Sequence, residues 1–388
     1  MKNYLNPVIC DIKPSGIRRF FDIAAEMTDV ISLGVGEPDF DTPWTIRETA
    51  IYNLEQGKTV YTANAGLKEL RQEIARYSSR KYKLSYDPLR EILVTVGGSE
   101  AIDLALRAML VPGDEVLIPE PSYVSYIPCV IMAGGRPVNV PLLPENSFKL
   151  QAEDIESRIT EKTKAIVFPF PNNPTGSIMS REDLEPVAEV IKNHDLFVIS
   201  DEIYAELSYG DQSHISIASL PDMRERCLVI NGFSKAFSMT GWRLGYAMGP
   251  EDLVRQMIKI HQFAIMCAPT TSQYAAIQAL RACDDKVDAM RREYNRRRRY
   301  VLSRLSGMGL TCFEPQGAFY VFPSIRGLGM TSEEFCSRLL FDQKVAVVPG
   351  DAFGEHGEGF IRISYAYSLE ELKVALDRME VFLQGLKA

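Results

Sequence analysis

From about residue 91 the chain alternates short apolar runs with longer amphipathic patterns. The amphipathic stretches, such as 99–110 and 181–194, place apolar residues at helical spacing, whereas each apolar run has the length of one strand. The runs are EILVTV (91–96), EVLIP (115–119), AIVFPF (165–170), LFVIS (196–200) and CLVIN (227–231). Strands that alternate with helices predict right-handed crossovers and a mainly parallel sheet with helices on both faces. We therefore expect an α/β fold whose large domain spans 46–285.

The pattern changes after a charge-rich helical stretch at 285–306. The segments that follow are LTCFEPQGAFYVFPSI (310–325), VAVVPG (345–350) and GFIRISYA (359–366). This change indicates a smaller α+β domain. We expect it to be discontinuous and to comprise 1–45 and 286–388.

Composition and charge exclude several classes of protein. The 388-residue chain has 46% hydrophobic and 24% charged residues, as an ordinary globular protein does. Its formal charge of −8 argues against nucleic acid or an anionic membrane as the main partner, because both require a basic surface. The stretch RREYNRRRRY (291–300) is an exception, with six arginines in ten residues. We interpret it as a solvated helix face, since no aromatic or glycine platform accompanies it.

The cysteines and the N-terminal residues indicate a cytoplasmic protein. Seven cysteines are scattered without a CxxC pair, so neither a zinc site nor a disulfide framework is expected. The first residues, MKNYLNPVICDIKPSG, lack the apolar core of a signal peptide. No apolar run approaches the roughly 18 residues of a membrane span. A soluble protein without a metal site is therefore expected.

Four predicted strands are followed closely by polar or glycine-rich residues. The segments are GGSEA (97–101), PNNPTG (171–176), DEIY (201–204) and NGFSK (231–235). In an open parallel sheet, ligands bind outside the carboxyl ends of the strands. A single such loop is often only a turn, but four at one edge of a sheet predict a binding site.

Three of these segments have more than one interpretation. Gly97, Gly98 and Ser99 before a helix either offer backbone N–H groups to a phosphate or form only a tight turn. Asp201 is either a helix N-cap or a carboxylate held for a buried cation. Lys235 is decisive, because a lysine at the buried end of a strand must lose its charge or pair with an acid.

One cofactor requires all three features together. A desolvated lysine of lowered pKa is suited to forming a Schiff base with an aldehyde. Pyridoxal phosphate requires such a lysine, an acidic partner for its ring nitrogen and a cradle for its phosphate. The segments around Lys235, Asp201 and Gly98 are therefore a candidate site for this cofactor.

Five motifs carry a resemblance to a known family. In chain order they are GEPDF (36–40), YTANAGLKELR (61–71), PNNPTG (171–176), SDEIY (200–204) and SKAFSMTGWRLGY (234–246). They resemble the motifs of class I pyridoxal-phosphate aminotransferases of fold type I. The branch resembled includes bacterial aspartate and aromatic aminotransferases and the aminotransferase A group, some of whose members act on N-acetyl-diaminopimelate. The resemblance covers essentially the whole chain and implies pyridoxal 5′-phosphate as the cofactor, bound covalently by Lys235.

The resemblance also implies which residues surround the cofactor ring. Asp201 would pair with the protonated ring nitrogen, Tyr204 and Asn173 would hydrogen-bond its phenolic oxygen, and Tyr123 would stack on its face. Once released by substrate, Lys235 would be the base that moves a proton between the substrate Cα and the cofactor. Without the resemblance, Tyr123 is an ordinary core or surface aromatic.

For the phosphate, the groups implied are the backbone N–H groups of Gly98, Ser99 and Glu100, the Arg243 guanidinium, and Tyr61 of a second subunit. Without the resemblance, Tyr61 too is an ordinary core or surface aromatic. Gly232 departs from the family pattern, because related enzymes often have a serine three places before the lysine. Ser234 or a water would then replace that serine.

Arg362 is the residue implied for the substrate α-carboxylate, since arginine forms paired hydrogen bonds with a carboxylate. Gly36 and Asn173 are expected near the same carboxylate. The alternative for Arg362 is a buried structural ion pair. A distal carboxylate of the substrate could meet Arg18 or Arg19, unless these are surface residues of an amphipathic helix. The apolar region 261–273 could favour aromatic or long side chains.

The function implied is that of a homodimeric aminotransferase with shared active sites. It would move an amino group from an L-amino acid to a 2-oxo acid, 2-oxoglutarate being expected, by a ping-pong mechanism. A β-lyase on the same fold is the alternative, because cofactor and lysine are shared. An effector-sensing regulator with an aminotransferase-like domain is disfavoured, since the motifs begin by residue 34 and the charge is negative.

Overall fold

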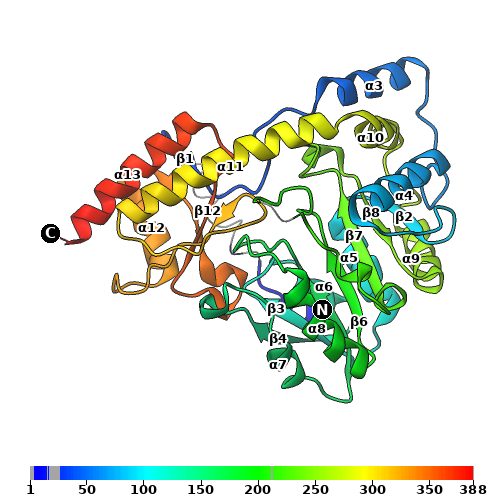
Figure 1. The fold of residues 1–388 in the computed structure, drawn as a ribbon, viewed down its shortest axis with the longest axis horizontal. Helices are drawn as coiled ribbons and strands as arrows, with labels where there is room; N and C mark the ends of the chain where they lie inside the picture. The colour runs from blue at the N-terminus through cyan, green and yellow to red at the C-terminus, as the bar shows by residue number, and fades with distance from the viewer. Residues whose placement is uncertain (1–3, 15, 17–26, 211–212, 388) are drawn as a thin grey trace.

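A seven-stranded sheet forms the centre of the larger part of the molecule (Figure 1). The computed structural model describes residues 4–14, 16, 27–210 and 213–387. The strand order is β2-β8-β7-β6-β5-β3-β4, and only β8 runs antiparallel to its neighbours. The strands are β2 (Ile92–Thr95), β3 (Glu115–Glu120), β4 (Arg136–Pro141), β5 (Thr163–Phe168), β6 (Phe197–Asp201), β7 (Cys227–Gly232) and β8 (Gly245–Met248). The predicted α/β fold with a mainly parallel sheet is confirmed.

All five predicted apolar runs form strands of this sheet, whereas β4 and β8 were not predicted. β4 lies at the edge of the sheet and only its last two residues are buried, so it lacks a continuous apolar run. β8 follows β7 through a loop without an α-helix. A loop can reverse the chain direction, whereas a parallel connection requires a longer crossover.

Helices cover both faces of the sheet. Successive residues of β2 pack into two different cores. Leu93 packs with residues of α5 and α9, whereas Ile92 and Val94 pack with residues of α4 and α10. Burial on both faces explains why the strands are almost continuously apolar. The helices of this part are α3 (Trp44–Glu55), α4 (Lys68–Tyr82), α5 (Gly98–Met109), α6 (Tyr126–Met132), α7 (Ala152–Glu156), α8 (Arg181–Asn193), α9 (Glu251–Ala264) and α10 (Thr270–Ala282).

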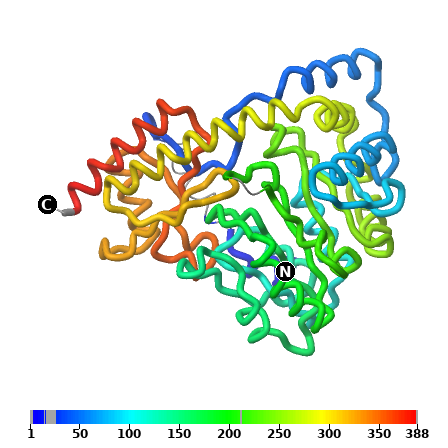
Figure 2. Tube along the Cα trace, viewed as in Figure 1, coloured from blue at the N-terminus to red at the C-terminus, as the bar shows by residue number. Residues whose placement is uncertain are grey.

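A smaller part of the molecule lies at the other end of the long helix α11 (Asp284–Gly307), as Figure 2 shows. It contains a three-stranded antiparallel sheet of order β11-β12-β9 and the parallel pair β1-β10. Its strands are β1 (Ile31–Ser32), β9 (Tyr320–Val321), β10 (Val345–Ala346), β11 (Val348–Pro349) and β12 (Ile361–Ser364). Its helices are α12 (Ser332–Gln343) and α13 (Leu369–Lys387), and the short α1 (Pro7–Asp11) precedes them in the chain.

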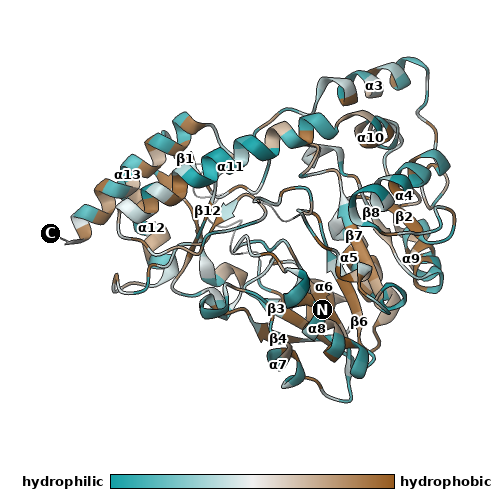
Figure 3. Cartoon of the chain, in the orientation of Figure 1, coloured by the Kyte–Doolittle hydropathy of each residue, from teal (hydrophilic) through white to brown (hydrophobic). Residues whose placement is uncertain are grey.

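The arginine-rich stretch lies on α11, which is largely hydrophilic, in contrast to the apolar central strands (Figure 3). The interpretation as a uniformly solvated face is only partly correct. Arg296 and Arg299 are exposed, but Arg297 and Arg298 are buried. Arg298 pairs with Glu314 at 2.8 Å, so two of the arginines serve internal contacts.

Within the described ranges, no helix is both long and apolar enough to span a membrane.

Candidate active site

A cavity of about 590 Å³ lies where the carboxyl ends of the parallel strands face the smaller part of the molecule. It draws on the loops after β6 and β7, the start of α5, and strands β9 and β12. The predicted site residues that line it are Gly36, Gly98, Ser99, Tyr123, Asn173, Asp201, Tyr204, Ser234, Lys235, Arg243 and Arg362. Glu100 and Tyr61 are the predicted residues that do not line it.

Lys235 lies three residues beyond the end of β7, and its half-buried side chain enters this cavity. Its ammonium group donates a hydrogen bond to the carbonyl of Gly36. Burial lowers the pKa of Lys235 to about 8; nearby Glu37 opposes this shift, whereas Arg362 adds to it. Within the described part of the chain no carboxylate forms an ion pair with Lys235. Of the two possibilities for a buried lysine, pairing with an acid is therefore not supported, and the lowered pKa makes loss of the charge easier.

Asp201 ends β6 and is held by two hydrogen bonds. Its Oδ1 accepts the backbone N–H of Ile203 at 3.2 Å, and its Oδ2 accepts the hydroxyl of Tyr126 at 2.7 Å. Burial raises the pKa of the Asp201 carboxyl, and the hydrogen bond from Tyr126 opposes that rise. No helix begins at Asp201, so it is not a helix N-cap. Tyr126 was not predicted, although it lies at the start of α6 and lines the cavity.

Arg362 projects from β12 with a side chain that is only 3% exposed. Its Nη1 donates to Asn173 Oδ1 at 2.9 Å, and its Nη2 donates to the carbonyl of Gly34. Its Nε is buried without a hydrogen-bond partner among the residues described. No carboxylate pairs with Arg362 within those ranges, so the alternative of a structural ion pair is not supported. A buried cation that faces a cavity with an unsatisfied donor is suited to binding an anion.

Two tyrosines meet beside Arg362. The hydroxyl groups of Tyr204 and Tyr320 lie 2.8 Å apart, and the Arg362 guanidinium lies 4.4 Å from the centre of the Tyr320 ring. A Cβ at Gly36 would lie 2.3 Å from the Tyr320 hydroxyl, so a larger residue at this position would collide. Tyr320 was not predicted, because nothing in its local sequence distinguishes it from a core aromatic.

The start of α5 and Arg243 form the other end of the cavity. Gly97 has a φ of +81°, and a Cβ there would lie 2.7 Å from Arg243 Nη2. The glycine therefore allows the guanidinium to approach the backbone of the loop. The first N–H groups of a helix have no partner within the helix and favour an anion. Gly98 and Ser99 at this helix start, together with Arg243, are therefore suited to a phosphate.

Glu100 stabilises this loop with its side chain. Its Oε2 accepts the backbone N–H of Val96, and its Oε1 lies 2.8 Å from His261 Nδ1 on α9. His261 is fully buried. The structure therefore places His261 behind the loop rather than in the cavity.

Gly232, the departure from the family pattern, lies where β7 and β8 approach each other closely. A Cβ at this position would lie 3.0 Å from Gly245 Cα on β8 and 3.1 Å from the carbonyl oxygen of Leu244. The close approach of β7 and β8 at this point leaves little room for a serine side chain. Ser234 lines the cavity and is 9% exposed.

The remaining predictions concern residues away from the cavity. Tyr61 is 79% exposed. None of the region 261–273 lines the cavity, and Phe263 within it is 86% exposed, so no role in this chain's own site is supported. Arg18 and Arg19 lie outside the described residues. Across those that are described, no cluster of metal-ligating side chains was found.

Comparison with known proteins gives the family. The model of aminotransferase class I and II matches residues 28–379. The chain belongs to this family. It is 50% identical to an aspartate aminotransferase of Pyrococcus abyssi and 46% identical to aromatic-amino-acid aminotransferase 2 of Thermococcus litoralis, each over 97% of both chains. A solved structure titled Pyrococcus protein-A1 superimposes with a TM-score of 0.97 at 48% identity, covering 98% of this chain and 99% of that one.

Membership in the family gives the reaction class. The protein is a transaminase that uses pyridoxal 5′-phosphate to move an amino group from an L-amino acid to a 2-oxo acid. In this family the reaction proceeds in two half-reactions, with 2-oxoglutarate as a general amino acceptor. The resemblance to class I aminotransferases of fold type I is thus confirmed.

Proposed function

We propose that the cavity around Lys235 is the transaminase active site and that Lys235 both binds the cofactor and transfers the substrate proton. The observation that supports this most strongly is a lysine of lowered pKa, about 8, inside a cavity that also contains an acid and a buried arginine. A lysine that is partly neutral near physiological pH is both a nucleophile and a base.

The two ends of the cavity fit the two ends of pyridoxal phosphate. Arg243 and the start of α5, with Gly98 and Ser99, present a guanidinium and backbone N–H groups suited to the phosphate. Asp201 would hold the ring nitrogen through its carboxylate, Tyr204 would hydrogen-bond the phenolic oxygen, and Tyr123 would stack on the ring. When bound, the cofactor supplies an aldehyde and a protonated ring that accepts electrons from the substrate Cα.

Arg362 and Asn173 are proposed to bind the substrate α-carboxylate. The buried, unsatisfied Nε of Arg362 and the place of this side chain in the cavity lining support this assignment. Asn173 already fixes Nη1, so the guanidinium is oriented before the substrate binds. Binding here would place the substrate Cα near Lys235.

We also propose a homodimer in which Tyr61 reaches the phosphate of the partner's site. Tyr61 does not contact the cavity of its own chain, yet it belongs to an exposed apolar patch with Val60, Phe263, Ile265 and Met266. Hydrogen bonds from Asn64 to the Met266 carbonyl and from Thr270 to the Val60 carbonyl join the two segments of this patch. Exposed apolar patches of this kind are typical of interfaces.

The proposed division into domains follows from the two groups of strands. All strands of the large sheet lie within 92–248, which supports a large cofactor-binding domain over 46–285. The small sheets use 31–32 and 320–364, which supports a discontinuous small domain of 1–45 and 286–388.

Seven unpaired cysteines support a cytoplasmic location.

Replacement of Lys235 by alanine tests the central assignment. The variant should fold with an unchanged melting temperature, within a few degrees, and should lose the pH-dependent absorbance of the covalently bound cofactor. Lys259, an exposed lysine on α9, is the matched control, and Lys259→Ala should keep that absorbance. An unchanged spectrum in Lys235→Ala would show that another lysine binds the cofactor.

A single-turnover experiment tests the reaction itself. Without an amino acceptor, the wild-type enzyme with glutamate should release about one equivalent of 2-oxoglutarate per subunit, because each site carries one amino group at a time. A β-lyase would instead release pyruvate and ammonia from a suitable donor, over many turnovers. That second outcome would contradict amino transfer as the main reaction.

A further inference from the structure

Arg297 is a buried arginine in a run of otherwise mostly solvated ones. Its side chain is 7% exposed, whereas that of its neighbour Arg296 is 61% exposed. Burying a guanidinium is costly unless it is paired and hydrogen-bonded. The contacts of Arg297 therefore show why this arginine, unlike Arg296, points inward.

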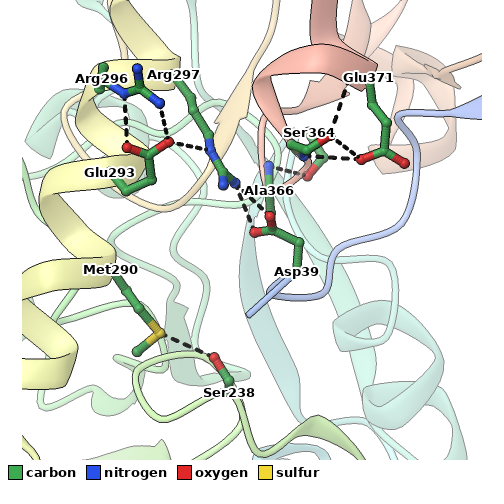
Figure 4. A network of polar contacts seen from close by, with 10 residues as sticks. Asp39, Ser238, Met290, Glu293, Arg296, Arg297, Ser364, Ala366 and Glu371 are labelled. Atoms are coloured by element: carbon green, nitrogen blue, oxygen red, sulfur yellow. Dashed lines mark hydrogen bonds and ion pairs between the residues drawn. The ribbon is translucent and has the colours of Figure 1, made fainter. Parts of the chain in front are cut away.

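The guanidinium of Arg297 is held from several sides (Figure 4). Its Nη1 lies 2.8 Å from both carboxylate oxygens of Asp39, and its Nε donates to Glu293 at 3.0 Å. It also lies 5.1 Å from the centre of the Phe40 ring and 5.7 Å from that of Tyr294. These contacts leave the guanidinium little freedom and fix Asp39 and Phe40 against α11.

Asp39 closely follows residues that hold the two basic groups of the site. The carbonyl of Gly34 accepts a hydrogen bond from Arg362, and the carbonyl of Gly36 accepts one from Lys235. Both carbonyls are backbone groups, so their positions depend on the path of segment 34–39. A shift of this segment would move the partners of Lys235 and Arg362 together.

The segment is also anchored on either side of these residues. The Leu33 N–H donates to the Ala346 carbonyl and the Leu33 carbonyl accepts from the Ser364 N–H, both at 2.8 Å. The Thr42 hydroxyl donates to the Ser238 carbonyl. Between Leu33 and Thr42, no backbone–backbone hydrogen bond forms within the described ranges. The ion pair between Arg297 and Asp39 lies in this interval, next to the residues that matter for the site.

We propose that Arg297 is a positioning residue of the active site, which acts through Asp39 to hold segment 34–39 in place and with it the Gly34 carbonyl that accepts a hydrogen bond from Arg362. This inference rests on the proposed function, because that function makes the cavity a substrate site. The ion pair between Arg297 and Asp39 does not depend on it. Arg297, in the arginine-rich stretch of α11, would thus affect substrate binding without contacting the substrate.

The test compares Arg297→Gln with Arg296→Gln in the intact holoenzyme. Both changes remove one arginine that contacts Glu293, but only the first breaks the pair with Asp39. In Arg297→Gln, hydrogen exchange of the backbone amides of Leu33 and Ser364, which are hydrogen-bonded where the segment begins, should accelerate by at least about threefold, because local opening becomes easier. The KM for glutamate should rise by about tenfold, because the Gly34 carbonyl that orients Arg362 is displaced. The kcat should stay within about threefold, because the residues that carry out the chemistry are displaced less. Arg296→Gln should change neither quantity by more than about twofold.

Two further variants keep the inference testable if Arg297→Gln folds poorly. Asp39→Asn removes the same ion pair from the other side and should reproduce the exchange and KM effects. Arg297→Lys keeps the charge without the planar guanidinium and should recover part of the wild-type KM.

Three results would overturn the inference. They are equal exchange in the two glutamine variants, faster exchange with an unchanged KM, and a lower melting temperature without either effect. The exchange measurement does not require turnover. Failure of the proposed function would appear instead as an inactive wild-type enzyme, and the exchange comparison would still decide whether Arg297 holds segment 34–39.

Discussion

Tyr126 shows how one side chain can control the charge of another in a buried site. Its hydroxyl donates to Asp201 at 2.7 Å, and it is 2% exposed. Burial raises the pKa of Tyr126 well above its usual value, so this group remains a neutral donor throughout the physiological range. A donor of this kind stabilises the ionised carboxylate, which is the form required to hold a protonated ring nitrogen.

We expect Tyr126→Phe to lower kcat by about tenfold, because a hydrogen bond to a charged group is worth about 1.5–3 kcal/mol. The absorbance of the bound cofactor should also titrate at a different pH than in wild type. Tyr82→Phe is the control, since Tyr82 is also buried and donates to a carboxylate, that of Glu206, at 2.6 Å but outside the cavity. Equal kinetics and spectra for the two variants would rule out a special role for Tyr126.

The lowered pKa of Lys235 predicts how cofactor uptake depends on pH. Only the neutral amine reacts with an aldehyde, and with a pKa of about 8 the neutral fraction falls tenfold per pH unit below that value. In protein freed of cofactor, the rate of pyridoxal phosphate uptake should therefore rise steeply up to about pH 8 and then level off. Stopped-flow absorbance measures this rate, with Lys235→Ala as the background of surface lysines. A rate that rises without a break to about pH 10 would show an ordinary lysine.

At the residue scale, the sequence identified parts of the candidate site where a polar residue closely follows an apolar run. Lys235 and Asp201 were found in this way, and the cavity contains both. Tyr126 and Tyr320 were missed, because their partners Asp201 and Tyr204 lie 75 and 116 residues away in the chain. Contacts over such distances depend on the packing of the whole fold, which local patterns do not contain.

At the element scale, the five strands that are buried on both faces were predictable, and the less regular elements were not. β8 has only four residues and follows a loop, yet it is fully buried between the edge strand β2 and β7. Its close approach to β7 at Gly232 and Gly245 depends on two glycines. A reversal of chain direction in a parallel sheet leaves no periodic signal in the sequence.

We expect Gly232→Ser to lower the free energy of unfolding by about 1–3 kcal/mol, because the added side chain overpacks the contact between β7 and β8. Urea denaturation followed by circular dichroism measures this change. Gly307→Ser is the control, since a Cβ at Gly307 meets nothing within 4 Å. Equal stability of the two variants would mean that β7 and β8 accommodate the serine without a loss in the free energy of unfolding.

At the scale of the whole molecule, the fold class and the reaction class were predictable from the motifs. The proposed contact between subunits would be a property of two chains. The apolar patch around Tyr61 is formed by segments about 200 residues apart, 60–61 and 263–266, so the sequence alone did not indicate it. If the dimer is isologous, each subunit both gives and receives a Tyr61.

Complementation between two inactive variants tests this shared site. Tyr61→Phe should itself lose about tenfold or more in activity, because a hydroxyl that donates to a phosphate dianion contributes about 1.5–3 kcal/mol. Lys235→Ala should be inactive. A heterodimer of the two has one site with both defects and one site with neither, since Lys235 comes from one chain and Tyr61 from the other. Activity should therefore reappear above that of either parent after the subunits are mixed. Native mass spectrometry establishes that the subunits have exchanged. If they have and no activity returns, Tyr61 does not act in the partner's site.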